Sequence, residues 1–198
     1  MYNITKEKIT ALIAHPDDEI IFGFALIPDI SVNKIICCSN DKKNYNYPQW
    51  KNRITALEEV GELIKVEIIC LDYNSEFYTL KPEGLNICCK NILHTIKLEH
   101  TLITHNSWGE YGNLDHIIIN RLAKNENKNL IVTNIARSIS KYGVPLYNCR
   151  EIGEYLGKFT VNLDLYSQCK EIYKRYNCWT WDDTFFSQIK LYYQQHNE

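Results

Sequence analysis

Short runs of apolar residues alternate along the chain with longer segments in which apolar residues recur every three or four positions. Uninterrupted apolar runs are typical of strands buried on both faces of a sheet, and the longer spacing is typical of amphipathic helices. The pattern predicts five strands, over residues 9–14, 34–39, 66–71, 100–105 and 129–135. It predicts helices between and after them, over residues 20–27, 50–64, 84–97 and 115–123.

This alternation predicts an α/β fold with a mostly parallel sheet and helices on both faces. The last third is less regular, and we expect a strand over 158–165 and helices over 166–176 and 183–193. Because the chain has 198 residues and neither a repeat nor a low-complexity linker, we expect a single domain over 1–198. Ligands of open α/β sheets bind beyond the carboxyl ends of the strands, so we expect the functional residues in the loops that follow the strands.

The composition excludes several classes of protein. The formal net charge is −2 and no basic stripe is present, which argues against nucleic acid as a partner. No apolar run is long enough to span a bilayer and no apolar leader opens the chain, so we expect a soluble, cytoplasmic protein. The eight cysteines include two adjacent pairs but no C-x-x-C spacing, which favours reduced, buried thiols over disulfides or a metal site.

The loop after the first predicted strand reads AHPDDE over residues 14–19. Capping of the following helix would explain one or two of its acidic residues, but not three of them together with a histidine. In such a turn His15 and Asp18 can converge on one point while Asp17 faces the same space. An imidazole and a carboxylate are two of the three protein ligands that a catalytic zinc needs, so this loop favours a metal site.

The loop after the fourth predicted strand reads HNSWGEYGNLDH over residues 105–116. Two of the chain's eight glycines, Gly109 and Gly112, lie here, where they permit positive φ and a close approach of backbone to ligand. Two histidines and two carboxylates flank them. A polar loop without a site is the alternative, but two such loops at neighbouring strand ends favour one shared site.

The first loop resembles the A-H-P-D-D-E signature of the PIG-L/LmbE family of zinc-dependent N-deacetylases. Residues 104–116 resemble that family's second motif, which commonly reads T-H-N-x-W-G-E-Y-G-H-x-D/E-H. The order and separation of the two motifs also match. Arg53 resembles the arginine of the family's R-x-x-E helix, with Ala56 where glutamate is usual, and Lys170 resembles the lysine of its closing helix. The resemblance is strong in the two motifs and weak after His116.

The resemblance implies a Rossmann-like, LmbE-type fold and a hydrolase that removes acetyl groups from N-acetylglucosamine-type sugars. The expected partner is a small N-acetyl sugar, a sugar nucleotide or a glycoconjugate, and a homo-oligomer is compatible with the sequence. The family pattern places Zn²⁺, or another divalent transition metal, on His15, Asp18 and His116. It makes Asp17 the general base and Asp115 a residue that orients a ligand.

Asn113 departs from the family pattern, which usually has a histidine there to stabilise the oxyanion. An asparagine side chain donates a hydrogen bond but carries no charge and transfers no proton. The phenol of Tyr111, in the same loop, can supply the missing donor. We therefore count Tyr111 and Asn113 with Asp17 and Asp115 as candidate catalytic residues. A metal-binding module with weak or no catalysis is the alternative.

Arg53, Trp108 and Glu110 are the expected substrate contacts. Sugars stack on aromatic rings, and further candidates for such a platform are Tyr45, Tyr47, Trp50, Trp179 and Trp181. A nucleotide-binding domain is disfavoured, because the loop after the first strand is anionic and lacks the glycine-rich turn that phosphates require.

Overall fold

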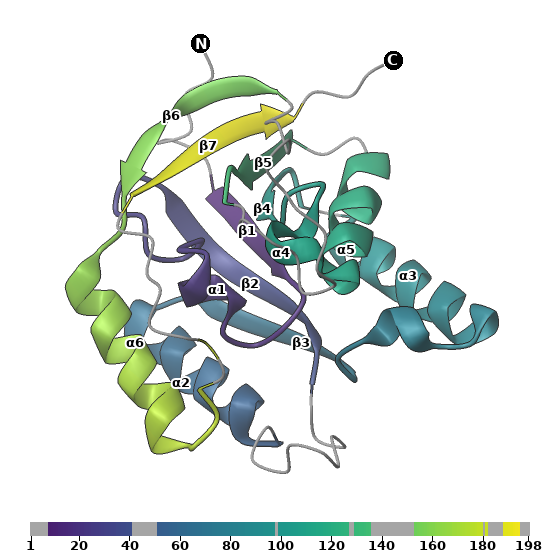
Figure 1. The fold of residues 1–198 in the computed structure, drawn as a ribbon, viewed down its shortest axis with the longest axis horizontal. Coiled ribbons are helices and arrows are strands. Elements are labelled where there is room, and N and C mark those ends of the chain that lie inside the picture. Colours follow the sequence, from purple (N-terminus) through teal and green to yellow (C-terminus); the bar gives the residue numbers. More distant parts are fainter. Residues whose placement is uncertain are drawn as a thin grey trace.

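A computed structural model describes residues 8–40, 51–97, 99–126, 129–135, 153–179, 181 and 188–194. In this part of the chain seven strands form one sheet in the order β3-β2-β1-β4-β5-β7-β6 (Figure 1). The strands are β1 (Lys8–Ile13), β2 (Ser31–Ser39), β3 (Glu67–Tyr73), β4 (Thr101–Thr104), β5 (Asn129–Thr133), β6 (Glu154–Thr160) and β7 (Gln188–Gln194). Strands β1 to β5 are parallel, and β7 is antiparallel to both of its neighbours, β5 and β6.

Helices cover both faces of the sheet (Figure 1). The helical elements are α1 (Asp18–Ile21), α2 (Arg53–Ile64), the 3₁₀ turn η3 (Phe77–Thr79), α3 (Pro82–Ile96), α4 (Gly109–Gly112), α5 (Leu114–Asn125) and α6 (Leu163–Arg175). On one face α1, α2 and α6 bury their apolar sides in one core, and on the other face α3 and α5 form a second core. In the described residues, no helix is long and apolar enough to cross a membrane.

Strand β1 shows why the sequence of a central strand is an unbroken run of apolar residues. Ile9, Ala11 and Ile13 belong to the core under α2 and α6, whereas Leu12 belongs to the core under α3 and α5. Successive side chains of a strand point to opposite faces, so a strand covered on both faces needs apolar residues at almost every position. The predicted α/β class, with a mostly parallel sheet between two helical layers, is confirmed.

The predicted helix over 183–193 is wrong, because residues 188–194 form strand β7 and residues 182–187 lie outside the described ones. Ile189 and Leu191 are buried while Lys190 between them is exposed, which is the two-residue period of a strand. Pairing with β5 and β6 fixes this segment as a strand.

Two other boundaries differ from the prediction. The predicted strand over 158–165 lies further upstream, at β6, because Asn162 begins helix α6 by accepting a hydrogen bond from the backbone N–H of Leu165 at 3.0 Å. The predicted helix over 20–27 is a single turn, α1, that ends before Gly23, whose φ of 69° breaks the helix.

Candidate metal centre and its surroundings

The two motif loops meet at one edge of the sheet. The first follows β1 and the second follows β4, and these strands are parallel neighbours, so their carboxyl ends lie side by side. The backbone N–H of Ala14 donates to Nε2 of His105 at 3.1 Å, which joins the two loops directly. The residues predicted as metal ligands from separate parts of the sequence therefore come together.

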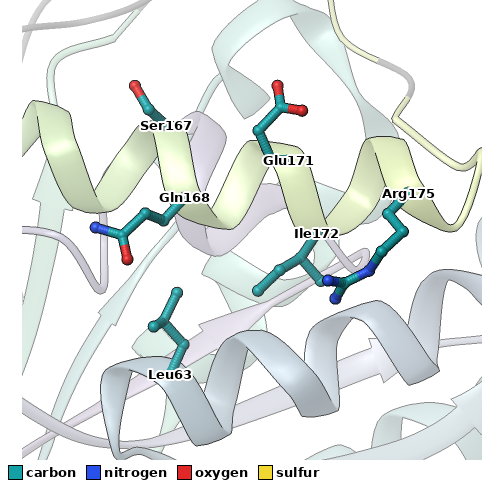
Figure 2. A pocket seen from close by; sticks show the side chains of 6 residues that line it. All are labelled: Leu63, Ser167, Gln168, Glu171, Ile172 and Arg175. Carbon is teal, nitrogen blue, oxygen red and sulfur yellow. The ribbon is translucent and has the colours of Figure 1, made fainter.

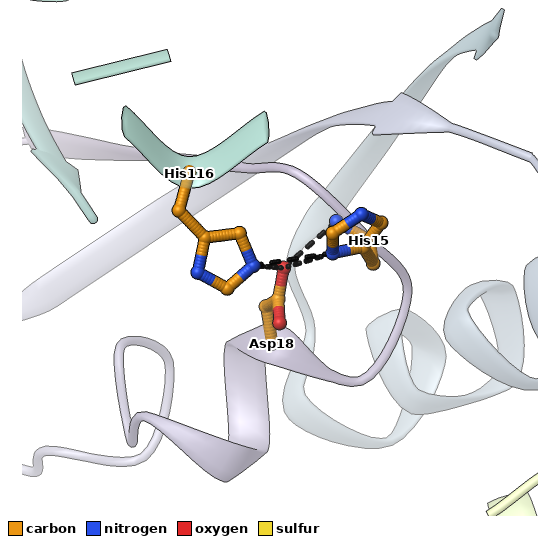
Figure 3. A group of neighbouring side chains, drawn as sticks. All are labelled: His15, Asp18 and His116. Carbon is orange, nitrogen blue, oxygen red and sulfur yellow. Dashed lines mark hydrogen bonds and ion pairs between the residues drawn. The ribbon is translucent and has the colours of Figure 1, made fainter. Parts of the chain in front are cut away.

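Three predicted ligand atoms converge (Figure 3). Nδ1 of His15 lies 3.2 Å from Nε2 of His116, and Oδ2 of Asp18 lies 3.4 Å from the first nitrogen and 3.6 Å from the second. Two ligands bound tetrahedrally to zinc at about 2.0–2.1 Å are about 3.3 Å apart. The three distances between the ligand atoms therefore fit one face of a tetrahedral zinc site. All three side chains are buried. The donor set of two imidazoles and one carboxylate is one that catalytic zinc sites use.

Asp115 orients His15. Its Oδ2 lies 3.1 Å from Nε2 of His15, which leaves Nδ1 directed toward Asp18 and His116. The same carboxylate accepts hydrogen bonds from the backbone N–H groups of Glu76, at 2.7 Å, and Tyr78, at 3.2 Å. Burial lowers the pKa of His15, but Asp115 and Asp18 outweigh it and raise this pKa to about 10, so a metal must displace a proton to bind there.

Glu110 orients His116 in the same way. Its Oε2 lies 2.7 Å from Nδ1 of His116 and 3.1 Å from Nδ1 of His105, whose ring stacks on that of His116 at 3.7 Å. Burial and the neighbouring His105 lower the pKa of His116 to about 4, so its imidazole is neutral and Nε2 offers a lone pair. Hydrogen bonds between a carboxylate and a metal-binding histidine fix the ring and raise its basicity.

Asp17 stands in a strained turn beside the three ligands. Its φ of 97° is in the left-handed region, which costs a residue other than glycine about 1–3 kcal/mol. Its Oδ1 accepts a hydrogen bond from Nη2 of Arg53 at 2.7 Å, and this guanidinium also donates to the carbonyl of Pro16. Both side chains of the ion pair are buried. Arg53, a predicted substrate contact, thus holds the predicted general base.

Asn113 uses both ends of its amide. Its Oδ1 accepts from the backbone N–H of Asp115 at 3.0 Å and caps helix α5, and its Nδ2 donates to the phenol oxygen of Tyr111 at 3.1 Å. The Tyr111 ring meets the His116 ring edge-on at 5.5 Å. Burial raises the pKa of Tyr111 well above its usual value, so the phenol keeps its proton.

The other predicted substrate contacts have protein partners. Glu110 is fully buried and also accepts the backbone N–H of Asn106 at 2.9 Å, and Nε1 of Trp108 donates to the carbonyl of Ile135 at 3.1 Å. Of the two other aromatic candidates that the structure describes, Trp181 lies beside the site, with its ring 5.6 Å from that of Tyr111 and 6.0 Å from that of Phe22.

The remaining aromatic candidates lie away from the metal ligands or outside the described residues. Trp179 packs 6.2 Å from Tyr173, and the Lys170 ammonium lies 5.7 Å from its ring. The predicted contacts at Tyr45, Tyr47 and Trp50 lie outside the described residues.

Sequence reasoning gave no role to three features of this region. His105 lies in the second motif, where it had no predicted role of its own, yet its ring stacks on that of His116. The 3₁₀ turn η3 and Glu76, the residue before it, contact the site through backbone hydrogen bonds to Asp115, which lies about forty positions later in the sequence, and neither lies in a predicted motif. Tyr173, on α6, donates to Glu19 at 2.7 Å, and no local pattern marks it.

A shallow groove lies elsewhere, between α2 and α6 (Figure 2). Its lining combines apolar and charged side chains from the two helices: Leu63, Ser167, Gln168, Glu171, Ile172 and Arg175. None of the converging ligands lines it.

The seven described cysteines are free thiols, and burial raises the pKa of each of the buried ones.

Several solved structures that share this fold are enzymes. The chain is similar to N,N'-diacetylchitobiose deacetylase from Pyrococcus horikoshii, with a TM-score of 0.55 and 18% identity over 91% of this chain and 74% of that one. It is similar to the A40926 pseudoaglycone deacetylase Dbv21, with a TM-score of 0.62 and 10% identity over 96% and 98% of the two chains. It is also similar to GalB, the 4-carboxy-2-hydroxymuconate hydratase of Pseudomonas putida, with a TM-score of 0.58 and 10% identity over 94% and 95%.

No protein-family model and no curated protein matches the sequence. At identities this low, the comparisons establish the shared fold, which two deacetylases and a hydratase use for different reactions. The fold alone does not define the reaction of this chain, which depends on the residues of its own site.

Proposed function

We propose that this protein is a metal-dependent hydrolase that removes the acetyl group from an N-acetylated amino sugar. The substrate is of the N-acetylglucosamine type, free or within a sugar nucleotide or glycoconjugate. The observation that carries the proposal is the convergence of His15, Asp18 and His116 at distances that fit tetrahedral zinc, with the Asp17 carboxylate in the same turn. The deacetylases among the structural neighbours support the same reaction class.

In this proposal Zn²⁺, or another divalent transition metal, is held by His15, Asp18 and His116. When bound, such an ion polarises an acyl oxygen and makes a water more acidic. Asp115 and Glu110 keep the two histidines in the tautomers that leave Nδ1 of His15 and Nε2 of His116 as ligand atoms. Glu110 is thereby proposed as a positioning residue, in place of the predicted substrate contact.

Asp17 is proposed as the general base. Its carboxylate takes a proton from the attacking water and returns it to the departing amine, which yields acetate and a free amino sugar. Arg53 keeps Oδ1 of this carboxylate in place. Because the guanidinium is committed to Asp17 and Pro16, we assign Arg53 to positioning the base.

Tyr111 is proposed as the donor to the oxyanion that forms at the acetyl carbonyl. Its oxygen accepts the Asn113 hydrogen bond, so its own O–H is directed elsewhere, and its raised pKa keeps that proton in place. Asn113 then acts by orienting Tyr111, since its two amide ends are occupied by the helix cap and the phenol. A donor fixed before the reaction stabilises developing charge without reorganisation.

The second candidate function is a metal-binding module without turnover. It is favoured by Asn113 itself, which has neither a charge nor a transferable proton at this position. The buried ion pair of Asp17 and Arg53 favours the hydrolase, because the three metal ligands do not require it.

The test is mass spectrometry of a panel of N-acetyl sugars, free and nucleotide-linked, after incubation with zinc-loaded protein. The expected product has lost one acetyl group in exchange for a hydrogen, and Asp17→Asn protein should not form it. Because a hydratase shares the fold, the panel includes unsaturated di- and tricarboxylic acids. Gain of one water on those acids, without deacetylation, would replace the proposal with a hydratase. Stoichiometric metal with an inert panel would favour the module.

A further inference from the structure

Asp17 is held from its backbone as well as from its carboxylate. It is the residue that precedes helix α1, and its side chain makes no capping hydrogen bond to that helix. Its backbone N–H instead donates to Oε2 of Glu19 at 2.9 Å, across the left-handed turn. The geometry of the proposed base thus depends on where the Glu19 carboxylate lies.

Glu19 is in turn held by a residue from the far end of the chain. Its other oxygen, Oε1, accepts a hydrogen bond from the phenol of Tyr173 at 2.7 Å. Both side chains are fully buried, so neither exchanges this partner for water. Tyr173 lies on α6, which packs against α1 and α2 (Figure 1). A hydrogen-bonded chain therefore runs from α6 through Glu19 to the amide of Asp17.

We infer that Tyr173 is a positioning residue for Asp17 and acts through Glu19. Two separate anchors fix the base: Arg53 of α2 holds the carboxylate, and the Tyr173–Glu19 pair holds the backbone. In the described residues, neither Tyr173 nor Glu19 hydrogen-bonds to His15, Asp18 or His116 side chains. We therefore expect the Tyr173–Glu19 pair to position Asp17 and not the three proposed metal ligands. This inference rests on the proposed function of Asp17, and its test includes a measurement that needs no substrate.

The test compares Tyr173→Phe with Tyr166→Phe. Both changes remove one phenol oxygen from the buried side of α6, and the two residues lie two turns apart, so Tyr166→Phe controls for loss of a hydroxyl in this helix. We expect Tyr173→Phe to lower kcat by about 10- to 100-fold with little change in KM, as a misplaced catalytic group does. Metal content and affinity should equal those of wild-type protein.

The measurement independent of activity is hydrogen exchange of the Asp17 amide, followed by NMR. In wild-type and Tyr166→Phe protein this amide should be protected, and in Tyr173→Phe it should exchange about tenfold faster or more. If exchange accelerates while wild-type protein is inert on every substrate, the anchor stands and the proposed function fails. If exchange and kcat match those of Tyr166→Phe, the inference is overturned.

Loss of metal from Tyr173→Phe would also overturn the inference, because the pair would then support the ligand set. If Tyr173→Phe does not fold, Glu19→Gln takes its place. This change keeps the size of the side chain and replaces one acceptor oxygen by a donor, so it weakens one of the two hydrogen bonds. The same split between kcat and metal content is expected, and an unchanged kcat would contradict the inference.

Discussion

The amide of Asn113 donates to the phenol of Tyr111 at 3.1 Å while its carbonyl caps helix α5. The family that the chain resembles usually has a histidine at this position. Here the residue is an asparagine that orients its neighbour. This relationship moves the proposed oxyanion donor from position 113 to position 111.

Tyr111→Phe is expected to lower kcat by about 10²- to 10³-fold, because it removes the hydrogen-bond donor proposed for the oxyanion. Metal content should not change, which elemental analysis checks. Asn113→His should alter the pH profile of kcat by adding a group that titrates near pH 6.5. A Tyr111→Phe enzyme with wild-type kcat would remove the phenol from the mechanism.

Asp17→Asn should abolish turnover and leave the metal bound. The amide matches the carboxylate in size but accepts no proton, and loss of general base catalysis costs about 10²- to 10⁴-fold. Steady-state kinetics and metal analysis of one preparation provide the check. Loss of metal with loss of activity would instead place Asp17 among the ligands.

His116→Ala should lose stoichiometric metal. Removal of one of three protein ligands leaves too few donors for a catalytic zinc site. His94→Ala is the matched control, because His94 is an exposed histidine on α3. Equilibrium dialysis against zinc measures both variants, and equal affinity in the two would contradict the assigned ligand set.

Glu110→Gln should weaken metal binding by about 10- to 100-fold, the usual effect of removing a carboxylate that orients a ligand histidine. The change acts through His116 Nδ1, 2.7 Å from the carboxylate. Glu83→Gln on the exposed surface of α3 is the control. If Glu110 instead bound substrate, KM would rise and metal affinity would remain that of the control.

Local sequence patterns were sufficient to predict the central strands and to identify both motif loops. Residues such as Ile9, Ala11 and Leu12 carry the strand signal in their own sequence, and parallel neighbours bring their loops together. Strand β7 was misread as a helix because its short, partly polar sequence becomes a strand through pairing with β5 and β6.

Contacts between residues that lie far apart in the sequence could not be predicted from local patterns. Glu19 lies in the first motif, but its partner Tyr173 is 154 positions away and has the pattern of an ordinary core residue of α6. Arg53 was recognised, although its partner was not, because a sequence does not show whether an arginine turns toward a substrate or toward a neighbouring carboxylate.

The anchor on Asp17 also has a consequence for biosynthesis. Every proposed metal ligand lies between His15 and His116, whereas Tyr173 leaves the ribosome later, with α6. The ligand set is thus synthesised in full before the residue that steadies the base. A chain that ends before α6 therefore contains every proposed ligand but lacks Tyr173, the partner of Glu19 in the anchor on Asp17.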